Sequence, residues 1–122
     1  MPADAPPFDL QSHSTYSDGS LQPAAVVATA AAAGVTLLAL TDHDTVDGLD
    51  EASAAARAHG IGLVAAVELS TVDVLGEDFH VLGYGIDHTS ALLAERLELW
   101  RADRAARSAR HSARRSARSR SV

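Results

Sequence analysis

The chain has no cysteine and no lysine among its 122 residues, and aromatic residues make up only 4% of it. The lack of cysteine excludes a disulfide scaffold, a thiolate metal site and catalysis by a thiol, and it is typical of a cytoplasmic location. Any bound metal must therefore be held by histidine, aspartate or glutamate. No apolar run reaches the length of about 18 residues that a membrane-spanning helix needs. The start MPADAPPFDL lacks the basic and apolar regions of a secretory signal, so we expect no membrane or lipid partner.

The net charge of −6 hides two regions of opposite sign. Residues 1–100 contain two arginines and fifteen acidic residues, whereas residues 101–122 contain eight arginines and one acidic residue, Asp103. The acidic body argues against non-specific nucleic-acid binding through a basic face, and it suits a body that holds metal cations. Hydrophobic residues make up 47% of the chain, which excludes a disordered polar chain. The length is enough for one small domain.

Apolar segments alternate in a pattern that predicts strands and helices in turn. We expect strands at 8–10, 35–40 and 61–67, helices at 24–33 and 49–59, a hairpin of 71–75 with 79–84, and a helix start at 90–100. Ser20 is the candidate N-cap of the first helix, and Gly34 and Gly60 are expected to end the two helices. Alternating units of this kind predict an α/β fold with a parallel sheet and right-handed crossovers.

Each of the three expected parallel strands is apolar up to its C-terminal end, where a potential metal ligand follows. His13 follows the first strand, Asp42 and His43 follow the second, and Glu68 follows the third. Because parallel strands place these ends on one edge of the sheet, we expect the four side chains to converge. Histidine and carboxylate ligands without sulfur suit Zn²⁺, Mn²⁺ or Fe²⁺.

Four ordered segments carry these polar residues: FDLQSHSTYSDG at 8–19, ALTDHDT at 39–45, VELS at 67–70 and HVLGYGID at 80–87. Together they resemble the PHP (polymerase and histidinol phosphatase) family. The most similar subgroup contains metal-dependent phosphoesterases, which include nucleoside-bisphosphate phosphatases and 5′-to-3′ exoribonucleases. The resemblance implies a distorted (β/α)₇ barrel with a centre of two or three metal ions. Residues 8–100 would form the N-terminal half of that barrel.

The resemblance also implies a role for each matching side chain. His13 resembles a ligand of the first metal, and Glu68 resembles a carboxylate that bridges two metals. His80 resembles a ligand of the second metal, and Asp18 and His43 resemble ligands of the third. The implied cofactors are therefore two or three divalent ions, Mn²⁺, Zn²⁺ or Fe²⁺.

Two further positions belong to the expected site. Gln11 stands where the family has the first histidine of a His-x-His pair, and an amide oxygen is a weaker donor to these metals than imidazole. Asp42 is expected to orient a metal-bound imidazole by accepting its other N–H. Asp42, His43 and Glu68 are therefore the candidate catalytic residues.

Structural roles compete with some of these assignments. Asp18 before Gly19 is also a common turn pair, and His80 lies in an apolar run where core histidines also occur. The run from Thr41 to Asp44 is also compatible with turn and N-cap chemistry, in which Asp44 or Asp47 would serve only as a cap.

The resemblance implies hydrolysis of phosphate esters of nucleotides or short oligonucleotides, with a metal-activated water as nucleophile. The family takes further ligands from its C-terminal half, and after His88 this chain has only His111, in the arginine-rich segment. We therefore expect an incomplete site. The alternative is a non-catalytic metal-binding or nucleic-acid-binding remnant of a PHP protein.

An amphipathic stripe of Leu93, Leu97 and Trp100 ends at Trp100, and no apolar face follows it. We expect a flexible leader at 1–7, a partial PHP domain at 8–100, and a disordered or non-native Arg/Ala/Ser-rich tail at 101–122 that comes from a truncated or frameshifted gene. The tail arginines suit RNA binding, but their monotony and the lack of aromatic residues favour a solvated tail.

Overall fold

The computed structural model describes residues 7–72 and 75–120, so the expected leader lies outside the described residues apart from Pro7. The elements are β1 (Phe8–Asp9), α1 (Pro23–Ala32), β2 (Leu37–Leu40), α2 (Leu49–His59), β3 (Gly62–Val72), β4 (Asp78–Tyr84) and α3 (Ala91–Arg120). None of the helices in this part of the chain combines the length and apolar character that crossing a bilayer requires.

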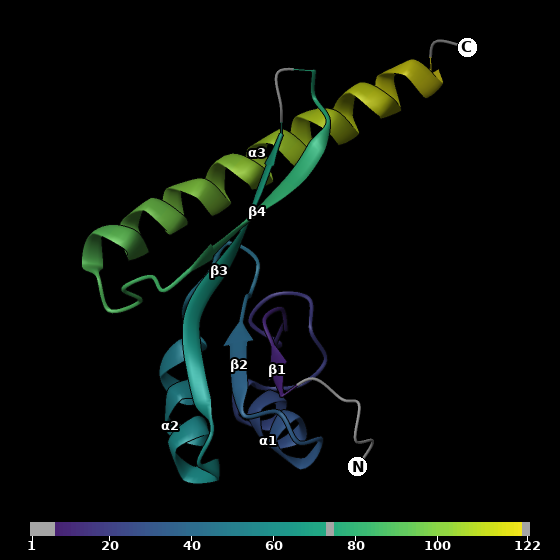
Figure 1. Ribbon diagram of the computed structural model, residues 1–122. Helices are drawn as coiled ribbons and strands as arrows, with labels where there is room; N and C mark the ends of the chain where they lie inside the picture. Colours follow the sequence, from purple (N-terminus) through teal and green to yellow (C-terminus); the bar gives the residue numbers. More distant parts are fainter. Residues whose placement is uncertain (1–6, 73–74, 121–122) are drawn as a thin grey trace.

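The strands form one curled, mostly parallel sheet in the order β1-β2-β3-β4 (Figure 1). β1 pairs with β2 and β2 with β3 in parallel, whereas β4 pairs with β3 in antiparallel fashion. The helices α1 and α2 connect the parallel strands, as the alternating pattern predicts. The predicted α/β half-barrel with parallel strands is therefore confirmed.

The ends of the first two helices follow from their terminal residues. Pro23 occupies the first turn of α1, where its missing N–H costs no hydrogen bond. The N-cap is Gln22, without a side-chain cap, so the expectation of Ser20 at this position is wrong. Gly60 ends α2 in the left-handed conformation (φ 70°), as predicted, and its N–H bonds the Ala56 and Arg57 carbonyl oxygens.

β3 is longer than the sequence predicts, because the expected strands at 61–67 and 71–75 are one continuous strand up to Val72. Its first half pairs with β2, and residues Ala66 to Val72 pair with β4. The polar Glu68 and Ser70 suggest a strand end in the sequence. The strand continues through them because β4 supplies a new row of backbone partners.

A small apolar core lies between the sheet and the helices. Its buried members come from all three helices and from β2 and β3, and they include Val27, Leu38, Leu40, Leu49 and Leu97. Leu97 is the only buried large hydrophobic residue of α3 among the described side chains, with 4% exposure. It therefore links α3 to the rest of the fold.

The helix α3 continues from Ala91 to Arg120, which differs from the expectation of a disordered segment after Trp100. The expectation relied on the missing apolar stripe, whereas alanine and arginine both have high helix propensity. Polar contacts also hold this part of the helix. The Trp100 indole N–H donates to the Ser70 carbonyl oxygen at 2.8 Å, and the Arg104 guanidinium donates to Asp44 at 2.7 Å.

We predict that Leu97→Ala lowers the free energy of unfolding by about 2–3 kcal/mol, because it removes buried methyl groups and leaves a cavity. The matched control is Leu99→Ala on the same helix, where the side chain is 64% exposed and the expected change is below about 0.5 kcal/mol. Urea denaturation followed by circular dichroism measures both. Equal effects of the two variants would contradict the packing of α3 described here.

Candidate metal centre

The loops that follow β1 and β2 meet the middle of β3. The Thr41 N–H donates a 2.7 Å hydrogen bond to the Ser12 carbonyl oxygen, so the segment that carries His13 lies beside the end of β2. His43 and Glu68 pair as an isolated parallel bridge beyond the last regular pair of β2 and β3. The structure thus brings these side chains together, in line with the argument from the strand ends.

Glu68 is the hub of the cluster, and it is only 3% exposed. Its Oε1 lies 3.0 Å from Gln11 Nε2 and 3.1 Å from His13 Nε2. Its Oε2 lies 3.4 Å from His43 Nδ1 and also contacts His80 Nδ1. Three imidazoles and one amide therefore surround one buried carboxylate.

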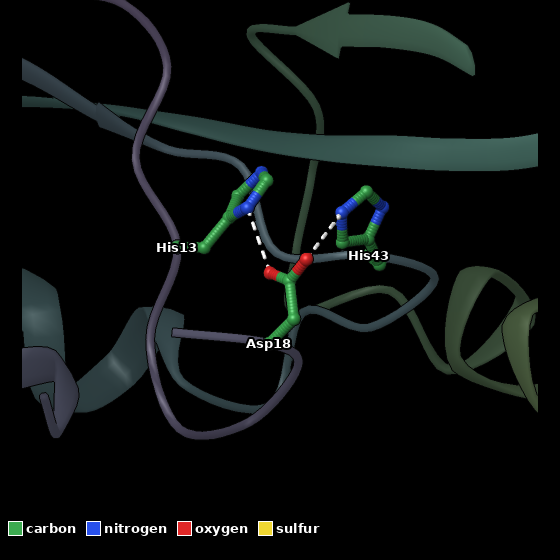
Figure 2. Close-up of side chains that lie close together, drawn as sticks. All are labelled: His13, Asp18 and His43. Atoms are coloured by element: carbon green, nitrogen blue, oxygen red, sulfur yellow. Dashed lines mark ion pairs between the residues drawn. The ribbon is translucent and has the colours of Figure 1, made fainter. Parts of the chain in front are cut away.

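Asp18 closes the cluster on its solvent side, where its side chain is 64% exposed. Its Oδ1 lies 2.8 Å from His13 Nδ1, and its Oδ2 lies 3.2 Å from His43 Nε2 (Figure 2). The centroids of these two imidazole rings are 4.4 Å apart. Asp18 and Glu68 therefore hold both imidazoles between two carboxylates.

Two overlapping groups of side chains could each hold a metal ion: His13, Asp18 and His43, and His43, Glu68 and His80. Within each group, one ligand atom of every residue lies within 4.8 Å of the others. The donors are imidazole nitrogen and carboxylate oxygen without sulfur, which fits Zn²⁺, Mn²⁺ or Fe²⁺. A neutral imidazole has one acceptor nitrogen, so in this arrangement His43 completes only one of the two groups at a time.

The electrostatics of Glu68 favour its charged form. Burial alone would raise the pKa of this carboxyl group. The hydrogen bonds from His80 and His13, the nearby His43 and the Gln11 amide outweigh burial, and the pKa lies below its ordinary value. Glu68 is therefore an ionised carboxylate that can bind a cation.

Asp42 has partners that differ from the predicted ones. Its buried Oδ1 accepts hydrogen bonds from the Ser14 N–H at 2.6 Å and the Ser17 hydroxyl at 2.7 Å, and its Oδ2 accepts one from the Ser14 hydroxyl. Within the described residues its hydrogen bonds run to these serines and not to an imidazole. The loop after β1 folds over Asp42, and Ser14 and Ser17 of this loop donate to the carboxylate. Asp42 therefore fixes the loop that carries His13 and Asp18, and its catalytic role stays a prediction.

Asp44 is a buried anchor between β3 and α3, whereas its sequence context suggests only a cap. Its Oδ1 accepts the Ser70 N–H at 2.8 Å, its Oδ2 accepts the Arg104 guanidinium at 2.7 Å, and its carbonyl oxygen accepts Arg101 at 2.7 Å. Its φ of 57° lies in the left-handed region, which residues other than glycine rarely adopt. The sequence signal for this anchor is that Asp44 is a second acidic residue directly after His43. Through Asp44, α3 is fastened to the loop that carries His43.

A cavity of about 410 Å³ lies against the outer side of the cluster. It is lined by potential metal ligands on one wall and by arginines of α3 on another: Tyr16, Ser17, Asp18, His43, Asp44, His80, Arg101 and Arg104. The cavity thus places guanidinium groups close to ligands for cations. Both kinds of group attract phosphate oxygens once the ligands hold metal.

The PHP domain family matches residues 9–110. The chain belongs to the PHP family. It is 49% identical over 82 residues to a 5′-3′ exoribonuclease from Haemophilus influenzae, which covers 67% of this chain and 30% of that protein. It is 46% identical over 91 residues to a 3′,5′-nucleoside bisphosphate phosphatase from Chromobacterium violaceum, which covers 75% of this chain and 32% of that protein.

Solved structures agree with the PHP assignment. An amidohydrolase from Chromobacterium violaceum matches 86% of this chain and 37% of its own, with a TM-score of 0.77 and 43% identity. A structure from Bifidobacterium adolescentis, described as a metal-dependent phosphoesterase, matches 83% of this chain and 35% of its own, with a TM-score of 0.73 and 31% identity. The chain spans about a third of the length of these curated relatives, so only part of a PHP domain is present.

We predict that Glu68→Gln weakens Mn²⁺ binding at least about tenfold, because it removes the charge at the centre of the cluster but keeps its size. Isothermal titration with MnCl₂ measures the affinity. Glu95→Gln is the matched control, since Glu95 is exposed on α3 and outside the cluster. Unchanged affinity in Glu68→Gln would contradict the assignment of Glu68 as a metal ligand.

We predict that Gln11→His tightens Mn²⁺ binding about tenfold, because imidazole is a better donor to this metal than an amide oxygen. The Gln11 Nε2 already lies 3.0 Å from Glu68, so a ring nitrogen there is close to the cluster. Gln22→His adds a histidine at an exposed position before α1 and is the control. Equal affinities of the two variants would show that position 11 does not reach the metal.

Proposed function

We propose that this chain contributes His13, Asp18, His43, Glu68 and His80 to the metal centre of a PHP phosphoesterase. The reaction is hydrolysis of phosphate esters of nucleotides or short oligonucleotides. The observation that carries the proposal is the convergence of three imidazoles on the buried Glu68 carboxylate, with Asp18 on the outer side. The relatives named as an exoribonuclease and a nucleoside bisphosphate phosphatase support the choice of substrate.

The two sides of the cluster support different metal positions. Glu68 presents its two carboxylate oxygens to different imidazoles, which is the arrangement that a bridging carboxylate needs. His13 would then serve the first metal and His80 the second, on opposite oxygens of Glu68. Asp18 and His43 would serve a third. We propose Mn²⁺, Zn²⁺ or Fe²⁺ in these positions, with two or three ions in a complete site.

Metal ions bound here would activate a water as nucleophile and stabilise the charge that develops on the phosphate oxygens. The chain's own residues prepare the site. Asp42 fixes the loop that carries His13 and Asp18. Glu68 can also accept a hydrogen bond from the ring N–H of a histidine whose other nitrogen binds metal, and this bond keeps the ring oriented. Arg101 and Arg104 line the cavity and place positive charge where a phosphate ester would enter.

A second candidate is a non-catalytic module that binds a metal or nucleic acid. Gln11 favours it, because the amide donates to Glu68 in the place of a histidine ligand.

We predict Mn²⁺-dependent release of phosphate from a nucleoside 3′,5′-bisphosphate or of nucleotides from a short 5′-phosphorylated RNA. His43→Ala and Glu68→Ala should each reduce this activity by at least about a hundredfold, because both remove groups of the metal cluster. His88→Ala is the control, since His88 pairs with Asp50 outside the cluster. Phosphate assays and denaturing gels measure the two reactions. Mn²⁺ binding without turnover of either substrate would contradict the catalytic proposal and support the second candidate.

A further inference from the structure

A second cavity, of about 710 Å³, lies between α3 and the outer half of the β3–β4 hairpin, where Figure 1 shows the helix running beside the hairpin. We call it the arginine groove. Its lining residues are Ser70, Thr71, Val72, Gly76, Asp78, His80, Arg104, Arg107, Ser108 and Arg110. His80 and Arg104 also line the cavity beside the metal cluster. The arginine groove therefore continues from the candidate metal centre.

The lining of the arginine groove contains more arginines than acidic residues. Arg104, Arg107 and Arg110 recur at every third position of α3, so they follow the helix away from the cluster with a rise of about 4.5 Å per step. The acidic residue in the lining is Asp78. Arg104 and Arg107 are already paired with Asp44 and Asp103. Arg110 is the arginine of the lining that has no ion pair with the described residues, and it makes the far end of the groove attractive to anions.

The three arginines differ in how many of their donor groups already bind other residues of the chain. Arg104 donates to the buried Asp44. The Arg107 Nε lies 3.0 Å from Asp103 Oδ2 on the same helix, so the buried end of this guanidinium group is already paired. Its two terminal nitrogens make no hydrogen bond or ion pair with the described residues. Arg110 is exposed and makes no ion pair with them. Arg107 and Arg110 thus retain donors that an anionic ligand can use.

We propose that the arginine groove binds the phosphate backbone of single-stranded RNA that extends from the metal centre. The proposal rests on the proposed function, and it narrows the substrate from mononucleotides to oligonucleotides. One RNA strand can occupy both cavities, with a phosphate at the metal cluster and its neighbours along Arg107 and Arg110. Guanidinium groups match phosphate geometry with paired N–H donors. The hydroxyls of Ser70 and Thr71 add donors that suit the same backbone.

The test compares RNA binding by two double variants of the full chain. Arg107→Gln/Arg110→Gln removes two charges from the arginine groove. Arg57→Gln/Arg96→Gln removes the same charge from exposed positions outside both cavities. The probe is a fluorescent, 5′-phosphorylated RNA of about ten nucleotides, and anisotropy is measured in EDTA at several salt concentrations. Circular dichroism shows whether each variant keeps its helix content.

We expect the slope of log affinity against log salt to fall by about 1.4 in the groove variant, because each lost phosphate contact on a single strand is worth about 0.7. The control variant should keep the slope of the natural sequence. A nucleoside 3′,5′-bisphosphate should compete weakly with the RNA for the natural sequence, since it is too short to reach Arg110.

Several results would overturn the proposal. One is equal slopes for the two double variants, and another is competition by the nucleoside bisphosphate as strong as that by unlabelled RNA. A poly-glutamate peptide that binds as tightly as the RNA would assign the groove to an acidic protein instead. These outcomes are separate from failure of the proposed function, because binding is measured without turnover. Bisphosphate hydrolysis without RNA binding in the groove would support the proposed phosphoesterase function and contradict the RNA-binding proposal. RNA binding in the groove without hydrolysis would support the RNA-binding proposal and contradict the proposed function.

Discussion

The buried carboxylate of Glu68 is the constraint on which the site depends. An ionised carboxylate at 3% exposure is costly unless donors or cations surround it. Here the donors come from three different parts of the chain, namely the loop after β1, the loop after β2, and β4. The convergence of these three segments therefore also stabilises the ionised form of Glu68. A metal ion at the same place would satisfy the carboxylate through the same side chains.

Two further buried carboxylates, Asp42 and Asp44, support this arrangement. Asp42 binds the loop that carries His13 and Asp18, and Asp44 binds β3 through Ser70 and α3 through Arg104. Each is satisfied by backbone or side-chain donors, which a buried acidic group requires. The three carboxylates are neighbours in the structure but have different tasks, because their donors differ: imidazoles for Glu68, serines for Asp42 and arginine for Asp44.

The sequence predicts the parallel strands and the meeting of His13, His43 and Glu68, because strand-end position is encoded in local apolar runs. The direction of a side chain is not encoded in this way. Asp42 and Asp44 flank His43, yet the loop turn directs one to serines and the other to an arginine 60 residues away. The course of α3 escaped prediction for a similar reason. Beyond Leu97 the helix is held by Trp100 and Arg104 through polar partners on distant elements, and no periodic apolar pattern records such contacts.

The fold brings the acidic and the arginine-rich regions of the sequence together at two adjoining cavities. Asp18 and Glu68 of the acidic body could hold cations together with three histidines, and arginines of α3 line the adjoining cavities. A phosphate ester needs both, since its oxygens bind metal ions at the reacting phosphorus and guanidinium groups elsewhere. Arginines scattered through the acidic body would pair with the ligand carboxylates and compete with metal. Glu68 and Asp18 make no ion pair with an arginine among the described residues, and Arg104 pairs instead with Asp44.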